Sequence, residues 1–562
     1  MPERDQESLP NLTVSLKSEG DVELPWLKEI RATGSEDGAQ IARCDAKLIK
    51  RDHIRDSFWQ DMEEASQESC DLAFGLFDRY GRVSRKYIEP GFRQGSGVWG
   101  RELDVGDILL FEKLVVEPRA RRRGVGTKLA QAVLDHVRED AGQKKYVAMV
   151  RPGVPTQEVA EGEEDEYKRH LATSRRFWRS LGFRRIGTSF WFAFTDEEGH
   201  PSRQLDASQE WDPPQDTGLY TAISVQVEGA MYQVLSAPTP DPEDLRRLGR
   251  VLPETAEDER WFATDHEGNT VLHEAAMKGN LDIIKYLVAR CPDLAAARNR
   301  NGDTPLEALR SSMELLRTRS VYIEMVEVAS DRFKGFDQST IACVGFLSGG
   351  TGVFDLTQLS REEISQISSA TDTQARTIHP EADAIRHALR LTYGCTCGRC
   401  IGGFLSPRMK RILKQGALQQ RDVEVTLGWD EDDWFEEGRH MLTGLFVQCL
   451  KKGMVPNENN ILGLVPDKRQ PTLEAFLEEG GSVRSIGTTI FERMLGCEYW
   501  RQALYPTCQE TDTGRVLPEC RNDLELGFVS GMCGYKRVSP GRKYFHDEER
   551  EEEEEEDDDD EY

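Results

Sequence analysis

Apolar and polar positions around residue 120 predict a strand, a short turn and a helix. Residues 108–116 are apolar at all but two positions and Pro118 follows them, as expected of a buried strand that ends there. After the turn, apolar side chains recur at helical spacing on one face: Leu129, Ala130, Val133, Leu134 and Val137. Gly142 follows the last of them, where we expect a left-handed residue to end the helix.

Four neighbouring segments extend this pattern into an α/β domain. Two apolar runs predict strands at residues 146–150 and 190–194, and the second run is rich in aromatic side chains. Residues 172–183 predict a helix that ends in a Gly-Phe pair. Upstream, residues 73–77 and the turn at residues 80–81 predict an antiparallel hairpin.

The remaining patterns suggest where the domains begin and end. We expect residues 1–25 to form a flexible N-terminal extension. Residues 196–242 carry several prolines and little apolar periodicity, so they predict a linker with partial structure. Residues 329–545 are mainly helical in pattern, most clearly in four segments: 381–391, 408–413, 439–450 and 472–477.

Charge narrows the range of partners. The 562-residue chain has a net charge of −28, which argues against direct nucleic-acid binding because such binding normally needs a basic surface. The segment 546–562 is the most acidic, with 14 acidic residues and one Arg from Asp547 onward. Such a block repels itself and predicts a disordered tail. The tail would attract basic proteins such as histones; the alternative is that it only increases solubility.

The chain has no run of 18 apolar residues, and its N-terminus lacks an apolar signal core. We therefore expect an intracellular protein, cytoplasmic or nuclear or both, with no membrane segment. In such a reducing compartment the 12 cysteines should be free thiols or metal ligands rather than disulfides.

The turn between the predicted strand and helix has the composition of an anion-binding loop. A helix N-terminus carries unpaired amides and a partial positive charge, and glycines let a phosphate approach the backbone. The loop residues are Arg121, Arg122, Arg123, Gly124, Val125, Gly126 and Thr127. A P-loop is excluded because Thr127 stands where it needs Lys, and a dinucleotide fingerprint is excluded because Leu129 replaces its third glycine.

The spacing Pro-x-x-Arg-x-x-Gly-x-Gly resembles the acetyl-CoA pyrophosphate loop of the GNAT superfamily of N-acetyltransferases. With the helix that ends in Gly-Phe, the resemblance covers residues 26–195. It implies a mixed, mostly antiparallel sheet with flanking helices. It also implies that the loop amides hold the pyrophosphate of acetyl-CoA, the cosubstrate. The strand before the loop would pair with the pantetheine arm through Leu114, Val115 and Val116.

Acetyl transfer to a primary amine also needs proton transfer. Glu112 is the one carboxylate inside the predicted strand and is a candidate general base; the alternative is an outward-facing strand residue paired with Lys113 or another neighbour. In this family a Tyr four residues before the Gly-Phe pair often protonates the leaving thiolate. That position holds Trp178, which has no acidic hydroxyl. This departure supports an alternative, a catalytically inactive GNAT-like scaffold.

The acceptor has one indication in the sequence. Acidic side chains gather where the family's substrate cleft opens: Glu158, Glu161, Glu163, Glu164, Asp165 and Glu166. They would attract a cationic amine such as a polyamine or a Lys-rich protein tail. The alternative is a solvated acidic loop.

Residues 268–280, with the sequence GNTVLHEAAMKGN, resemble an ankyrin repeat. A second, degenerate copy starts at Gly302, 34 residues after Gly268. Two repeats rarely form a stable solenoid, so we expect helices over residues 242–262 and 311–328 to complete a module spanning residues 243–328. The resemblance implies a protein partner; the alternative is that the module only packs the chain's own domains together.

Three cysteines in a C-x-C-x-x-C arrangement predict a structural zinc site: Cys395, Cys397 and Cys400. Spacing does not identify a fourth ligand, and the candidates are His379, His387, Cys343 and Cys508. The other C-terminal cysteines are too far apart in sequence to predict knuckles: Cys497, Cys508, Cys520 and Cys533. Reduced cysteines without a metal are the alternative.

We therefore expect a multidomain chain. It should contain an α/β GNAT fold, an all-α ankyrin-type module and a mainly helical domain with the cysteines. The predicted function is an acetyl-CoA-dependent N-acyltransferase that acts on a primary amine of a protein or a small molecule.

Overall fold

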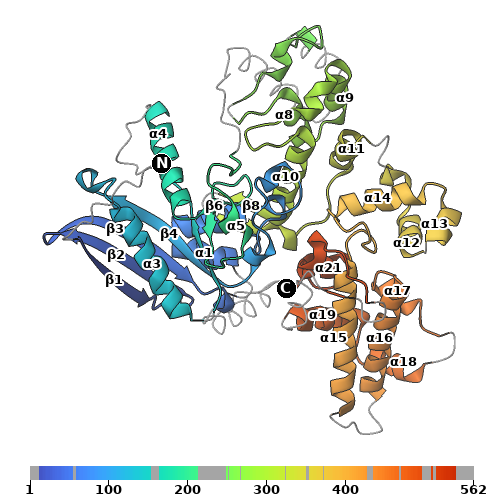
Figure 1. The fold of residues 1–562 in the computed structure, drawn as a ribbon. Helices are drawn as coiled ribbons and strands as arrows, with labels where there is room; N and C mark the ends of the chain where they lie inside the picture. Colours follow the sequence, from blue (N-terminus) through green and yellow to red (C-terminus); the bar gives the residue numbers. More distant parts are fainter. Residues whose placement is uncertain are drawn as a thin grey trace, which may run out of the picture. The chain divides into compact units, whose positions relative to one another are not determined.

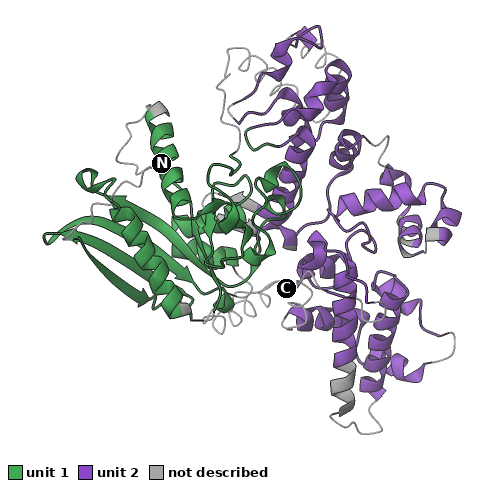
Figure 2. Ribbon diagram, in the orientation of Figure 1, with its two compact units in different colours: residues 1–216, 300–302, 541–562 green, residues 217–299, 303–540 purple. Residues whose placement is uncertain are grey.

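The structure is a computed structural model that describes residues 12–54, 58–142, 144–153, 164–212, 249–250, 252–265, 267–322, 325–349, 354–370, 372–426, 434–466, 470–495, 508–509 and 514–538. The chain divides into two compact units, with residues 1–216, 300–302 and 541–562 in the first and the remainder in the second (Figure 2). Five parts of the sequence predictions lie outside the described residues: residues 1–11 of the expected extension, the acidic residues Glu158, Glu161 and Glu163, the linker beyond residue 212, Cys497, and the acidic tail 546–562.

A mixed seven-stranded sheet forms the centre of the first unit (Figure 1). Its strands are β1 (Leu12–Gly20), β2 (Leu27–Glu36), β3 (Ala39–Ile49), β4 (Asp107–Val116), β5 (Tyr146–Val150), β6 (Arg184–Arg185) and β7 (Phe192–Phe194). The order is β1-β2-β3-β4-β5-β7-β6, and every pair is antiparallel except β4 with β5. This arrangement confirms the predicted mixed, mostly antiparallel sheet.

The sheet begins inside the segment expected to be a flexible extension, residues 1–25. β1 pairs with β2 along its whole length, and exposure alternates along the strand. Leu12, Val14 and Leu16 pack against the core. The prediction was wrong for β1, because an edge strand that is covered on one face needs apolar residues only at alternate positions. Polar residues between these positions conceal the strand in the sequence.

Helix α3 lies across one face of the sheet (Figure 1). The helices of this unit are α1 (Phe58–Ala65), α2 (Gln67–Leu76), α3 (Val125–Ala141), α4 (Glu164–Ser180) and α5 (Pro201–Gln204). All five apolar residues predicted from the helical spacing of α3 are buried in the main core. The helix ends at Gly142 with φ +58° and ψ −109°, a glycine conformation that differs from the left-handed one we expected.

The hairpin predicted around residues 73–81 is wrong. Residues 67–76 form α2, and Ser66 caps this helix by accepting a hydrogen bond from the Ser69 amide at 3.2 Å. Only a single bridge, Phe77 with Val83, has the predicted strand pairing. The apolar run is too short to distinguish a strand from a helix by periodicity, and the Ser66 cap together with burial of Leu72 favours the helix.

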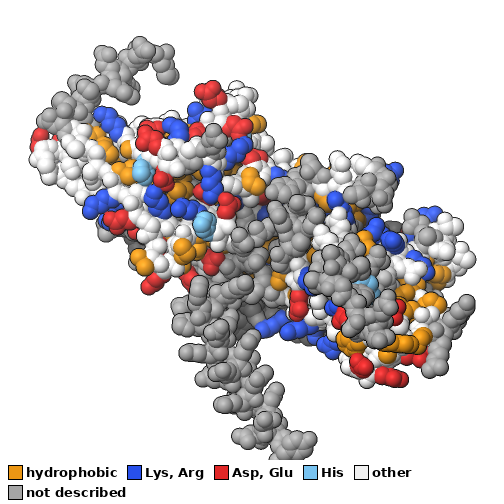
Figure 3. Space-filling view, turned by 90° about the horizontal axis from the view of Figure 1, so that it is seen from below, with side chains coloured by type: hydrophobic (Ala, Val, Ile, Leu, Met, Phe, Trp, Pro, Cys, Tyr) orange, Lys and Arg blue, Asp and Glu red, His pale blue; other side chains and the backbone are white. Residues whose placement is uncertain are grey.

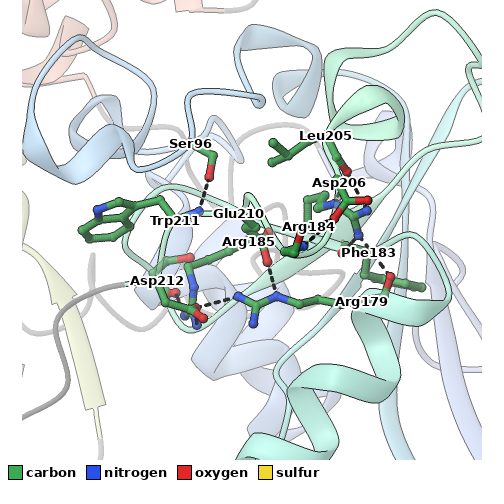
Figure 4. Close-up of polar contacts among 12 residues, drawn as sticks. Ser96, Arg179, Phe183, Arg184, Arg185, Leu205, Asp206, Glu210, Trp211 and Asp212 are labelled. Carbon is green, nitrogen blue, oxygen red and sulfur yellow. Dashed lines mark hydrogen bonds and ion pairs between the residues drawn. The ribbon is translucent and has the colours of Figure 1, made fainter. Parts of the chain in front are cut away.

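Residues 196–212, which we call the strap, fold onto the first unit instead of starting a linker. Figure 4 shows their polar contacts. Arg184 of β6 donates two hydrogen bonds to the Leu205 carbonyl, at 2.9 and 2.7 Å. Further along, the Trp211 amide donates to Ser96 Oγ at 2.9 Å.

Ion pairs with α4 and β6 hold the end of the strap. The Glu210 side chain is fully buried, pairs with Arg179 of α4 and accepts a hydrogen bond from the Arg185 amide at 2.5 Å. Asp212 contacts the guanidinium groups of both arginines, at 2.6 and 2.7 Å. A low apolar content suggested a linker, but here buried charge pairs provide the contacts that apolar residues usually make.

The second unit begins with a helix pair of the ankyrin type, α8 (Val271–Met277) and α9 (Leu281–Arg290). His273 lies on α8 and is completely buried. Its Nδ1 accepts a hydrogen bond from the Thr270 amide at 3.2 Å, so the ring proton is assigned to Nε2, which donates to the Asp303 carbonyl at 2.8 Å. This histidine joins the first repeat to the start of the second.

The second copy departs from the expected helices. Helix α10 (Pro305–Thr318) is followed by a hairpin, β8 (Arg319–Tyr322) and β9 (Met325–Val328). The helix predicted over residues 311–328 is therefore wrong beyond Thr318, because β-branched and aromatic residues after this point favour strands. In the described part of residues 242–262, the structure has a 3-10 helix over Glu259–Phe262.

The rest of the second unit is helical, as predicted. Its helices are α11 (Gln338–Leu347), α12 (Arg361–Ser369), α13 (Asp372–Ile378), α14 (Ala382–Thr392), α15 (Pro407–Thr426), α16 (Trp434–Lys451), α17 (Glu458–Leu462), α18 (Pro471–Glu478), α19 (Val483–Leu495) and α21 (Leu526–Met532). All four predicted helical segments coincide with one of them. Ile341 and Val344 of α11 share a core with α8 and α9, so α11 provides packing that we expected from the flanking helices.

Two further findings concern the whole described part of the chain. None of its helices combines the length and the hydropathy that a bilayer-crossing segment requires. Every cysteine in it is a free thiol.

Candidate functional site

Strand β4 changes its neighbours half-way along its length. From Ile108 to Phe111 it lies between β3 and β5. The pairing with β5 ends where Phe111 faces Val150. From Glu112 to Val116 the strand keeps β3 as a partner, and no strand of the described residues pairs with its other edge. The second half of β4 therefore presents an open edge inside an otherwise continuous sheet.

The main-chain groups at this open edge can be assigned from the pairing with β3. The Glu117 amide donates to the Ile41 carbonyl at 2.9 Å, so Glu117 faces β3. Successive residues of a strand direct their amide groups to opposite edges. Leu114 and Val116 therefore face the open edge, whereas Val115 faces β3. Leu114 and Val116 are two of the three residues named from the sequence for contact with a pantetheine arm.

The open edge leads into the amino end of α3. Gly124 is the N-cap residue with φ +78°, and Arg122 also has a positive φ of +64°. The chain thus turns through left-handed backbone, which glycine adopts without strain. Gly124 has no side chain that could cap this helix end, and the first amides of a helix, here those of residues 125–127, have no intrahelical partner. They are free to bind an anion.

The arginines of the loop have different environments. Arg121 Nε donates to the Val116 carbonyl at 2.9 Å, and Arg123 binds both carboxylate oxygens of Glu36 on β2, at 3.2 and 2.6 Å. Both side chains therefore brace the loop against the sheet. Arg122 is exposed on the loop surface. Two of the three arginines predicted to attract phosphate therefore also fix the shape of the loop.

Glu112 is the extra residue of a β-bulge, since Asp45 faces Lys113 and Ala46 faces Phe111. Its Oε1 accepts a hydrogen bond from Ser66 Oγ at 2.6 Å and lies 3.1 Å from Lys47 Nζ. The Lys47 side chain is only 9% exposed. These contacts connect β4 to β3 and to the start of α2, so the candidate general base has a structural role.

Trp178 belongs to the core rather than to an exposed site. It is 5% exposed, and its ring lies 5.1 Å from Phe111 and 5.0 Å from Phe183, measured between centroids. An indole in this position offers no acidic hydroxyl to a leaving group. The residue that would protonate a leaving thiolate is therefore not supplied by this position of α4.

The strand edge, the glycine loop and the helix are the parts of a known fold. Residues 91–161 match the model of the acetyltransferase (GNAT) family. The chain carries a GNAT domain. The matched segment includes β4, the loop, α3 and β5, so the resemblance predicted from the loop is confirmed. This domain supports an acetyltransferase-type enzyme.

A second match concerns residues 255–288, which fit the model of ankyrin repeats. The segment includes α8 and most of α9 and confirms the predicted ankyrin resemblance. An ankyrin repeat indicates a protein-interaction function. No curated protein and no solved structure matches the chain.

The cysteine cluster belongs to the second unit and not to the GNAT domain. The structure brings together Cys395, Cys397, Cys400 and, from far along the chain, Cys520, with all four sulfur atoms within 4.8 Å of one another. Hydrogen bonds from Cys397, Cys400 and Cys520 lower the pKa of the Cys395 thiol far below its ordinary value. Such a group of thiols is chemically suited to a soft metal ion.

Sequence spacing did not identify Cys520 as the fourth member. The four candidates named from the sequence lie elsewhere: Cys343 is in the core of the ankyrin region, Cys508 accepts a hydrogen bond from Arg411, and His379 and His387 are not in the group. The signal that could have found Cys520 is the sequence Cys-Arg-Asn-Asp, because it places hydrogen-bonding residues directly after a cysteine. That signal is too short to be specific.

On the face drawn in Figure 3, basic and acidic side chains of the described residues are interspersed rather than separated into one basic field. Of the acidic residues predicted to line an acceptor site, Glu164, Asp165 and Glu166 form the first turn of α4, and Glu166 Oε1 lies 3.7 Å from His170 Nε2 of the same helix. This contact is a local pair along one helix.

Proposed function

We propose that this protein is an acetyl-CoA-dependent N-acyltransferase that moves an acetyl group to a primary amine. The observation that carries the proposal is the continuity between the open edge of β4 and the uncapped amino end of α3. An extended arm with amide groups can pair along Leu114 and Val116. Its pyrophosphate would then reach the free amides of residues 125–127, where the helix dipole favours negative charge.

The reaction requires the protein mainly to position the amine against the thioester. The amine nitrogen attacks the thioester carbonyl carbon, so a C–N bond forms while the C–S bond breaks, and the carbonyl oxygen gains negative charge on the way. The amine loses a proton and the thiolate of CoA takes one up. Holding both reactants in line supplies a large share of such a rate enhancement. The Oε2 atom of Glu112 is the group of β4 that could accept the proton, directly or through water.

An inactive scaffold is the alternative, and Trp178 is the observation that favours it. A domain that binds acetyl-CoA without transferring the acetyl group would retain the loop and lack proton-transfer groups. Free thiols throughout the described chain suit a reducing, intracellular compartment. We therefore place the protein inside the cell.

The ankyrin repeat would bind a protein partner, which is either the acceptor itself or a factor that brings the acceptor to the GNAT domain.

Two measurements on the full chain separate these functions. Calorimetric titration should show one acetyl-CoA site per chain, and a thiol-release assay with a panel of polyamines and Lys-rich peptides should show CoA production. Binding with no CoA release for any amine would establish the scaffold. No binding of acetyl-CoA or CoA would contradict both functions.

A further inference from the structure

The sulfur atoms of the cysteine cluster have the separations of a single-metal site. Neighbouring Sγ atoms are 3.5 Å apart for Cys395 and Cys397, 3.6 Å for Cys397 and Cys400, and 3.5 Å for Cys400 and Cys520. Four thiolates at a Zn–S distance of about 2.3 Å occupy the corners of a tetrahedron with edges of about 3.8 Å. A disulfide would need sulfur atoms about 2.05 Å apart.

Groups around the cluster donate hydrogen bonds to sulfur. The Arg399 amide donates to Cys397 Sγ at 3.3 Å, and the completely buried Asn522 donates from Nδ2 to Cys400 Sγ at 3.7 Å. Such donors stabilise thiolate ligands and fix their orientation around a metal ion. Gly398, with φ +67°, allows the tight turn that brings Cys397 and Cys400 to the same side.

The four ligands come from two segments separated by 120 residues. Cys520 lies two residues before Asn522, which also accepts a hydrogen bond from Arg317 at the end of α10. Arg521 pairs with Glu314 of the same helix at 2.6 Å. A metal ion at this point would therefore hold residues 520–532 to the C-x-C-x-x-C loop and keep both beside α10.

We infer that Cys395, Cys397, Cys400 and Cys520 bind one zinc ion as a closed four-thiolate site that holds the C-terminal segment of the second unit in place. Four protein ligands leave no open position for substrate, so the ion is structural. Iron–sulfur clusters are excluded by size, because their inorganic atoms would separate the four thiolates further. This inference is independent of acyl transfer, since all four ligands lie in the other unit.

The test uses the full chain purified without chelators, with zinc and iron measured by elemental analysis. Wild-type protein should contain about one zinc per chain. Cys520→Ser should release zinc to a chromogenic chelator at least about 100-fold faster, as expected when a ligand rather than an outer-sphere donor is lost. Cys508→Ser is the matched control: Cys508 is another buried thiol of the same unit, and its loss should leave the zinc content unchanged.

Cys520→His should restore zinc binding, because imidazole is also a zinc ligand. If the Ser variant does not fold, cobalt(II) exchanged into wild-type protein gives the answer, since its charge-transfer absorption increases with the number of thiolate ligands. A four-thiolate spectrum supports the inference, and a three-thiolate spectrum overturns the role of Cys520. Wild-type protein that contains iron or no metal overturns the zinc site itself.

Discussion

At the scale of single residues, two positions of the strand–loop–helix segment have distinct roles. Gly124 provides a backbone conformation, because its positive φ turns the chain into α3 without placing a capping side chain over the first amides. Glu112 provides side-chain contacts that join β4 to Lys47 and Ser66. Substitutions at the two positions should therefore affect different properties of the protein.

Gly124→Glu should weaken acetyl-CoA binding at least about tenfold, or about 1.4 kcal/mol. The new carboxylate would stand where a phosphate must meet the backbone. Isothermal calorimetry measures the effect. Gly142→Glu is the matched control, because this glycine also has a positive φ and open surroundings but lies at the opposite end of α3. If the two variants bind acetyl-CoA with equal affinity, the phosphate does not bind at the amino end of α3.

Glu112→Gln should reduce the free energy of unfolding by about 1–3 kcal/mol, because Lys47 would keep its charge in a nearly buried position without a carboxylate partner. Acetyl-CoA affinity should not change. Urea denaturation gives the first quantity and calorimetry the second. The control is Glu117→Gln, which removes an exposed pair with Arg119 and should cost less than about 1 kcal/mol. A rate loss of about 10²–10⁴-fold with unchanged stability would instead make Glu112 a general base.

At the scale of elements, the ankyrin pair depends on a buried polar link. Helix α8 is joined to the start of the second repeat by His273, which accepts one hydrogen bond and donates another as a neutral ring. Burial lowers the pKa of His273 below its ordinary value. A protonated ring would have to lose the hydrogen bond from the Thr270 amide, so this link is sensitive to acid.

The stability of α8 should therefore decrease as the pH falls below about 6.5, the ordinary pKa of histidine. In this range the unfolded chain binds a proton at His273 that the folded chain excludes, so acid favours unfolding. Hydrogen-exchange protection factors of the α8 amides, corrected for the intrinsic pH dependence of exchange, measure the effect. His273→Gln keeps one acceptor and one donor and should remove the pH dependence. Protection that is independent of pH in the wild type would contradict this role.

At the scale of the whole molecule, the proposed acetyl-CoA site and the inferred zinc site belong to different units. The strap completes the first unit by placing Glu210 and Asp212 against Arg179 and Arg185. Without the strap, Arg185, whose side chain is 2% exposed, would lose its charge partner. The boundary expected from the sequence, at residue 195, would remove these contacts.

A fragment of residues 1–216 should bind acetyl-CoA with an affinity within about threefold of the full chain, a difference below about 0.7 kcal/mol. A fragment of residues 1–195 should be less stable by about 3 kcal/mol or more, because it leaves the buried Arg185 without its carboxylate partner. Thermal unfolding and calorimetry on the two fragments test this prediction. Equal stability would show that the strap contributes nothing to the GNAT domain.

The sequence by itself determined the elements that are encoded by residues close together in the chain. The strand, glycine loop and helix from residue 107 to residue 141 follow from an apolar run, two glycines and a stripe at helical spacing. Neighbouring residues are sufficient to encode these features. The same is true of the ankyrin helices α8 and α9, and of the four helical segments in the second unit. In each case the apolar side chains identify the buried face before any partner is known.

Tertiary structure decided the contacts between residues that are distant in sequence. The short run at residues 73–77 became part of a helix because Ser66 caps it and its surroundings bury it. The strap joined the GNAT domain through charge pairs that have no periodic pattern. Cys520 reached Cys400 across 120 residues, since chain folding and not sequence spacing brings such groups together. Local patterns specify which face of an element is buried, whereas packing alone determines which distant residue it meets.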